Sequence, residues 1–266
     1  MSRVKNFLVV AAAGTILIYG TAWPDPVMKA NNIRTSNRPF MPGEKLTYSI
    51  SWSSVVDAGI AVMEVKDGPV VENKRTYSIT STTHSVGIVE AFYPVRDSVE
   101  SIVDADDLSS LSFHLQEQHG KRKRKRSMTF NQETGTVVSR LNDDPPETQR
   151  VPPHVQDALS ALYYMRTRSD FIPGAHVVVD VNDSGKTWAV EIHILGKEKI
   201  TTPAGTFETI KVKTYPKYEG VFMHRGEIYI WITDDDRKIP VLMKSTISIG
   251  SIVATLTKME GAKKVL

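Results

Sequence analysis

Polar and apolar residues alternate along most of the chain from residue 44 onward. In residues 44–52 the apolar side chains occupy every second position: Leu46, Tyr48, Ile50 and Trp52. A period of two with aromatic and β-branched residues is typical of a strand that buries one face. The same pattern predicts further strands at residues 60–65, 76–82, 95–103, 111–116, 127–130, 136–141, 176–181, 187–195, 207–214, 226–233, 239–247 and 252–258.

One segment follows the period of a helix instead. After two prolines, apolar side chains recur at spacings of three and four: Val155, Leu159, Leu162 and Tyr163. Proline is favourable in a first helical turn because its missing N–H has no partner there. Arg166 lies near the other end, where a positive charge suits the helix dipole. We therefore expect one prominent helix near residues 153–169.

The order of these elements indicates the fold class. Turn residues separate the expected strands, and strands do not alternate with long helices. This disfavours a parallel, doubly wound sheet. Short strands in close succession favour a mainly β fold with an antiparallel curved sheet. A sheet of this kind can curl into an open or half barrel or fold as a sandwich, and we expect the open or half barrel.

The N-terminus has the organisation of a secretory signal peptide. Arg3 and Lys5 precede an uncharged apolar stretch at residues 7–19, and small residues follow at Gly20 and Ala22. The apolar stretch is shorter than the ~20 residues that a membrane-spanning helix needs. We expect residues 1–22 to be removed by cleavage near Ala22 and the product to be periplasmic or otherwise exported, with an uncleaved membrane anchor as the alternative.

The rest of the chain reads as a short leader followed by one domain. Residues 23–41 are polar, contain proline and have no period, which is typical of a flexible linker. Residues 42–262 then form a single β-rich domain, which we expect to be a monomer. No cysteine occurs, so a disulfide, a cysteine-bound metal and a thiol nucleophile are excluded.

The positive charge is concentrated in one run. The chain has 33 basic and 30 acidic residues. Without residues 1–22 the count is 31 to 30, and without residues 121–126 as well it is 25 to 30. A general nucleic-acid binder spreads positive charge over a face, so no nucleic-acid partner is expected.

The run itself is the most unusual segment of the chain. It consists of Lys121, Arg122, Lys123, Arg124, Lys125 and Arg126. In a strand the lysines point to one side and the arginines to the other, so both faces are charged. We expect neither face to lie on an apolar core and the run to be a sheet edge, a protruding hairpin or a loop. It either binds an anionic partner, such as lipid head groups or an acidic polymer, or serves as a solvated edge that prevents aggregation.

Four blocks of the sequence resemble a known family. They are residues 40–52 (FMPGEKLTYSISW), 157–167 (DALSALYYMRT), 202–212 (TPAGTFETIKV) and 230–256, which begins IWITDDDRKIP. In order and spacing they resemble the domain-of-unknown-function 3108 family. The resemblance implies an exported bacterial protein with a curved antiparallel sheet and no established activity, and it brings no catalytic residues. The chain is also similar, more distantly, to half-barrel carriers of lipids and lipoproteins in the bacterial envelope.

Aromatic residues of the strands are candidates for a ligand surface. A half barrel leaves a concave face that can hold an amphiphile. Trp52, Trp188, Tyr229 and Trp231 either line that face as ligand-binding residues or belong to the core.

No pattern predicts a metal site, a cofactor or a catalytic centre. The acidic turns at residues 104–107 and 234–236 lack the spacing of a calcium loop. The histidines form no H-E-x-x-H motif, and no G-x-S-x-G motif occurs. A catalytic Ser–His–Asp site assembled from distant strands stays open.

Three functions are compatible with these features. The first is a non-enzymatic envelope protein that binds or carries an amphiphilic or anionic envelope component, with contact to a membrane surface. The second is a structural or protein-interaction module of the envelope that uses an exposed sheet edge. The third is a periplasmic hydrolase, which needs histidine and carboxylate side chains converging in a pocket.

Overall fold

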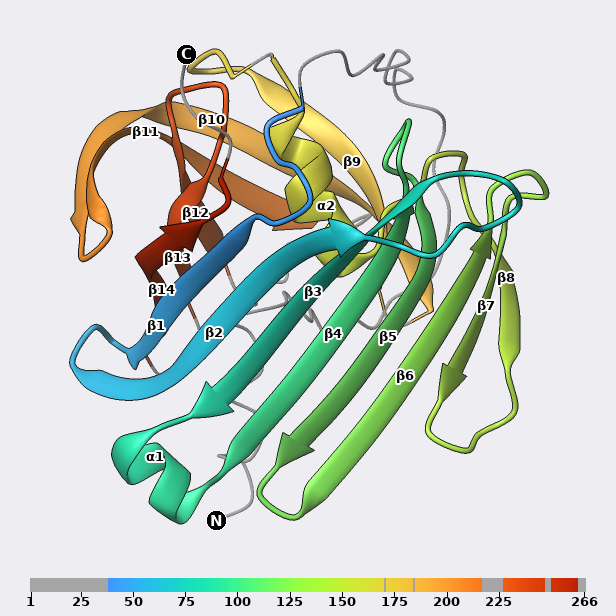
Figure 1. The fold of residues 1–266 in the computed structure, drawn as a ribbon, viewed down its shortest axis with the longest axis horizontal. Coiled ribbons are helices and arrows are strands. Elements are labelled where there is room, and N and C mark those ends of the chain that lie inside the picture. Colours follow the sequence, from blue (N-terminus) through green and yellow to red (C-terminus); the bar gives the residue numbers. More distant parts are fainter. Residues whose placement is uncertain (1–37, 170, 184, 217–226, 247–249, 263–266) are drawn as a thin grey trace.

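The computed structural model describes residues 38–169, 171–183, 185–216, 227–246 and 250–262, and these form one antiparallel sheet with two short helices (Figure 1). The strands are β1 (Lys45–Trp52), β2 (Val56–Asp67), β3 (Thr76–Ser85), β4 (Val95–Asp104), β5 (Ser110–His119), β6 (Arg122–Asn131), β7 (Thr136–Leu141), β8 (Glu147–Arg150), β9 (His176–Asp183), β10 (Lys186–Thr202), β11 (Gly205–Pro216), β12 (Ile228–Thr233), β13 (Pro240–Thr246) and β14 (Ser251–Glu260). The helices are α1 (Gly87–Phe92) and α2 (Ala158–Arg166). Among the described residues, neither helix has the length and apolar character needed to cross a bilayer.

The sheet is a continuous meander whose first and last strands pair. Its order is β8-β7-β6-β5-β4-β3-β2-β1-β14-β13-β12-β11-β10-β9. The edge strands β8 and β9 are not paired with each other, so the barrel is open. Near the gap, Gln156 bridges to β9: its N–H donates to the Asp180 carbonyl at 2.9 Å, and its carbonyl accepts from the Asn182 N–H at 2.7 Å. The mainly β, open-barrel prediction is confirmed, and a sandwich is not formed.

Every expected strand is present. Most bounds differ by a few residues, but β10 continues to Thr202, where an end at residue 195 was expected, and β6 already begins at Arg122, where a start at residue 127 was expected. The pattern missed β8 because its residues, ETQR, are polar and mostly exposed. It also missed α1, which has no buried residue. The expected signal peptide, residues 23–37 of the leader, and the strand ends Gly226 and Ile247 lie outside the described residues.

Helix α2 is shorter than the expected 153–169, and it begins after Asp157 and not at the prolines. Its N-cap is Asp157, whose carboxylate accepts from the Leu159 and Ser160 N–H groups, both at 2.8 Å. The Ser160 hydroxyl in turn accepts from the Asp157 N–H at 2.9 Å, which completes a capping box. The prolines therefore precede the helix and do not occupy its first turn. The helix contacts β3, β4 and β9 on the inner side of the curve (Figure 1).

Buried side chains from the strands and from α2 form one contiguous core. Leu46 and Tyr48 of β1 belong to it, as do Leu159 and Tyr163 of α2. The Tyr48 hydroxyl donates to the Pro240 carbonyl at 2.9 Å, so its one polar group is satisfied inside the core. The inner side of the curve is thus occupied by packed side chains.

The two ends of the curved sheet differ. Antiparallel strands place alternate turns at opposite ends. One end carries α1 together with the β1–β2, β5–β6 and β7–β8 turns, and we call it the α1 rim (Figure 1). The opposite end carries the β2–β3, β4–β5 and β6–β7 turns.

Candidate functional site

The basic run forms the turn between β5 and β6 and the first half of β6. Strand β7 pairs with β6 only from Arg126 onward, and Asn142, just after β7, bonds to the backbone of Lys125. Residues 122–124 therefore pair with β5 alone. The run is therefore a protruding hairpin, one of the three expected settings. Lysines and arginines alternate between its two faces, also as expected.

The arginine face points toward the core side. Arg126 is 9% exposed, and the same face of β6 continues with the buried Met128 and Phe130. The Arg124 side chain is 11% exposed and lies 3.4 Å from Glu117 (Nη1 to Oε2). The expectation that neither face lies on the core is thus wrong for Arg126. The side chain is tolerated there because acidic groups lie near it and Ser139 accepts from its Nη1 at 3.4 Å.

The arginines belong to an inner charge cluster whose signs are mixed. It comprises Asp97, Glu117, His119, Arg124 and Arg126, and it holds a 2.9 Å contact between the Asp97 carboxylate and His119 Nε2. Burial raises the pKa of the Glu117 carboxyl and lowers the pKa of the Arg126 guanidinium. Lowering the pH therefore favours a neutral Glu117 in the folded protein. Arg124 and Arg126 thus already have acidic groups near them, while Arg122 is exposed. A role of the three arginines in anion binding stays a prediction.

The lysine face is different. We use this name for Lys121, Lys123 and Lys125, all of which are exposed. Their cross-strand neighbours are neutral, since Lys123 lies opposite Gln118 and Lys125 opposite Gln116. Within the part of the chain that the structure describes, no acidic side chain pairs with any of the three.

Most other lysines among the described residues do have acidic partners. Those in ion pairs are Lys45, Lys66, Lys74, Lys197, Lys199, Lys211, Lys213 and Lys258. Alternate residues of a strand lie about 7 Å apart, so the lysine face is a row of like charges without compensation. Such a row attracts an extended anion or an anionic surface.

The aromatic candidates are divided between the two faces of the sheet. Trp188 shares the face of Ile192 and Ile194 on β10, toward the core. Trp52 lies at the α1 rim and is 43% exposed. Their role in ligand binding stays a prediction.

Tyr229 and Trp231 alternate with Ile230 and Ile232 along β12 and therefore point to the opposite face of the strand. Trp231 is 7% exposed and belongs to the core, which is one of the two settings expected for it, and Tyr229 packs against that core. The register pairs Trp231 with Lys211. The Trp231 Nε1–H donates to Glu198 at 2.9 Å, and Lys211 Nζ lies 4.8 Å from the Trp231 ring centre. Hydrogen bonds from Trp231 and Lys211 lower the pKa of Glu198.

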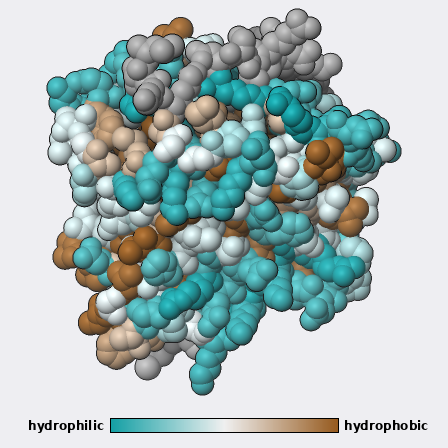
Figure 2. Space-filling model, in the orientation of Figure 1, coloured by the Kyte–Doolittle hydropathy of each residue, from teal (hydrophilic) through white to brown (hydrophobic). Residues whose placement is uncertain are grey.

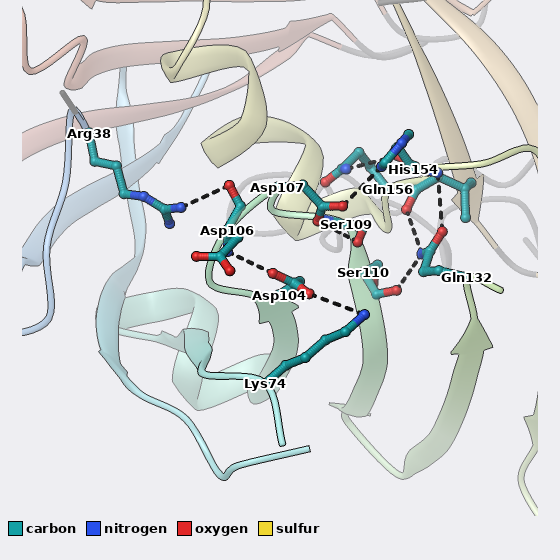
Figure 3. A network of polar contacts seen from close by, with 11 residues as sticks. Arg38, Lys74, Asp104, Asp106, Asp107, Ser109, Ser110, Gln132, His154 and Gln156 are labelled. Atoms are coloured by element: carbon teal, nitrogen blue, oxygen red, sulfur yellow. Dashed lines mark hydrogen bonds and ion pairs between the residues drawn. The ribbon is translucent and has the colours of Figure 1, made fainter. Parts of the chain in front are cut away.

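The acidic turn between β4 and β5 serves the local structure (Figure 3). Asp104 accepts from the Asp106 N–H at 2.6 Å, and Asp107 accepts from the Ser109 N–H at 2.8 Å and from His154 Nδ1 at 3.0 Å. Lys74 approaches Asp104 at 3.8 Å. These contacts tie the turn to the segment that leads into α2, and among the described residues no group of histidines and carboxylates has the arrangement of a metal site.

Comparison with known proteins places this geometry in a family. Residues 47–257 match the model of the family described as Protein of unknown function (DUF3108), and the chain belongs to this family. The expected resemblance is thereby confirmed. No curated protein matches the chain in sequence.

Among solved structures, the chain is similar to a β-barrel-like protein of domain of unknown function DUF1849 from Brucella abortus, with a TM-score of 0.58 and 11% identity over 83% of this chain and 98% of that one. A protein from Parabacteroides distasonis, provisionally described as a lipoprotein, matches with a TM-score of 0.37 and 11% identity over 84% and 97% of the two chains. A protein from Bacteroides fragilis, provisionally described as exported with a YmcC-like fold, matches with a TM-score of 0.33 and 14% identity over 85% and 98%. The first similarity supports the fold.

Proposed function

We propose that this protein is an exported, non-enzymatic envelope protein that binds an anionic envelope component through its lysine face. The observation that carries the proposal is the row of Lys121, Lys123 and Lys125 without acidic partners on a hairpin that protrudes from the sheet. Each cation near an anionic surface contributes about 1 kcal/mol. Three such residues contribute about 3 kcal/mol, which supports a weak and reversible contact.

Binding at the surface of the sheet is favoured over carrying an amphiphile on the inner side of its curve. The inner side of the curve holds the contiguous core, including Leu159 and Tyr163 of α2. An amphiphile held there would have to displace these side chains. The signal-like N-terminus supports export, where anionic lipids, glycolipids and polymers are abundant.

Replacing the three lysines with glutamine should weaken binding to a soluble anion. We expect the variant K121Q/K123Q/K125Q to bind dextran sulfate at least about 10-fold more weakly at low salt, since it loses about 1 kcal/mol per residue. Isothermal titration calorimetry measures the change, and raising the salt concentration should shrink the difference because exposed charges are screened.

The matched control is K66Q/K199Q/K258Q, which removes the same charge from exposed lysines that have acidic partners. Its affinity should stay within about twofold of the unmodified protein. An equal loss in both variants would mean that net charge alone drives binding, and the proposal would fail.

A further inference from the structure

The α1 rim exposes large apolar side chains beside the lysine face. Val55 of the β1–β2 turn and Phe92 of α1 are each 83% exposed, and Ile88 of α1 is 64% exposed. With the partly exposed Trp52 we call these four residues the apolar tip. Single exposed apolar residues are ordinary, but several on neighbouring turns at one end mark a contact surface.

The apolar tip and the lysine face are held next to each other. The residues that follow Phe92 contact the β5–β6 turn. The Gly120 N–H donates to the Pro94 carbonyl at 2.8 Å, and the Tyr93 and His119 rings lie 6.4 Å apart. Figure 1 shows α1 and the β5–β6 turn at the same end of the sheet. Figure 2 shows hydrophobic residues over α1 and hydrophilic residues over the neighbouring hairpin.

Helix α1 is fixed to the sheet although none of its side chains is buried. Arg96 of β4 donates from Nη1 and Nη2 to the Glu90 carboxylate at 2.7 and 2.5 Å, and the Ser85 hydroxyl also donates to Glu90. Hydrogen bonds from Arg96 and Ser85 lower the pKa of Glu90 to about 2. A lowered carboxyl pKa means that this clamp is present above the ordinary pKa and is lost only as the pH falls toward about 2. Near neutral pH the clamp therefore holds α1, with Ile88 and Phe92, against β4.

We infer that the α1 rim docks onto the surface of an anionic lipid bilayer. The apolar side chains enter the boundary between head groups and acyl chains, while the lysine face contacts the phosphates. Proteins that bind the surface of an anionic bilayer combine exposed apolar side chains with adjacent cations. The inference rests on the proposed function and names its partner. A lipid bilayer is favoured over a soluble acidic polymer because the polymer has no apolar region that the apolar tip could enter.

The decisive variant is I88S/F92S, which leaves every basic residue in place. We expect it to bind phosphatidylcholine vesicles containing phosphatidylglycerol at least about 10-fold more weakly than the unmodified protein, as measured by co-sedimentation, because membrane affinity scales with the apolar area buried. Its affinity for dextran sulfate should not change. The control V70S/I172S removes two apolar residues, 72% and 66% exposed, that lie outside the rim, and should leave vesicle binding unchanged.

The possible results separate this inference from the proposed function. Unchanged vesicle binding of I88S/F92S, or an equal loss in the control, overturns docking through the rim. A concentration-dependent dimer that dissociates in I88S/F92S also overturns it, because the apolar tip would then be a contact between copies of the chain. If dextran sulfate binding does not depend on the lysine face, the proposed function fails, whatever the vesicles show.

Discussion

Replacing Arg166 with methionine should lower the free energy of unfolding by about 3–5 kcal/mol, because it leaves the Glu44 carboxylate buried without its charge partner. The Arg166 Nη1 and Nη2 atoms lie 2.6 and 2.8 Å from the two Glu44 oxygens, and both side chains are essentially inaccessible to solvent. Arg166 Nη2 also donates to the Arg237 carbonyl at 3.0 Å. The pair joins the end of α2 to the start of β1, so urea denaturation should report the loss for the whole domain.

The double variant E44L/R166M provides the control for this prediction. Both charges are then removed, and the aromatic rings of Phe40 and Tyr163, 5.2 and 5.0 Å from the Arg166 guanidinium, can pack on the methionine. Replacing a buried pair by apolar residues is often neutral, so most of the stability should return. A double variant as unstable as R166M would show that the loss comes from packing and not from an unpaired charge.

Replacing Asp157 with alanine should lower the free energy of unfolding by about 3–5 kcal/mol. Without the buried carboxylate several donors lose their hydrogen-bond acceptor, at a cost of about 1–3 kcal/mol each. One carboxylate oxygen caps α2, and the other accepts from the hydroxyls of Ser101 and Ser110 on β4 and β5. The residue therefore fixes the helix to the sheet as well as starting it. Chemical denaturation followed by circular dichroism measures the change.

Two further variants show which contacts are responsible. Asp157→Asn keeps an acceptor for the helix N–H groups, so it should lose less stability than alanine. Asp143→Ala, at an exposed turn position, should change the free energy of unfolding by less than about 0.5 kcal/mol. Equal stability of D157A and the unmodified protein would contradict the role assigned to the cap.

Much of the fold was predictable because most of its strands bury one face. The alternation in β1, with Leu46, Tyr48 and Ile50 inside, is the direct consequence of that burial. Helix α1 and strand β8 were not predictable, since they bury almost nothing and leave no periodic signal. The start of α2 was misplaced because prolines and a capping aspartate both precede the apolar run, and only the structure shows that Asp157 forms the cap.

The candidate site was predictable in part. The charge run and its alternation were evident from the sequence, but the side on which each set of cations lies depends on strand pairing. The surroundings of Trp231 also depend on how the strands pair. Its neighbours Lys211 and Glu198 come from other strands, and the sequence pattern alone does not show which strand residues lie opposite each other. Phe92 and Ile88 carried no signal at all, since exposed apolar residues are recognised only when the surface is known.

Site-specific photo-crosslinking from position 118, on the strand next to Lys123, tests the central claim most directly. A photoreactive residue replacing Gln118 should, in the intact bacterial envelope, capture an anionic lipid, glycolipid or polymer that mass spectrometry identifies on the protein. The same residue placed at Val70, away from the α1 rim, should capture none of these. A single discrete protein adduct from position 118, or the same products from both positions, would contradict binding of an anionic envelope component by the lysine face.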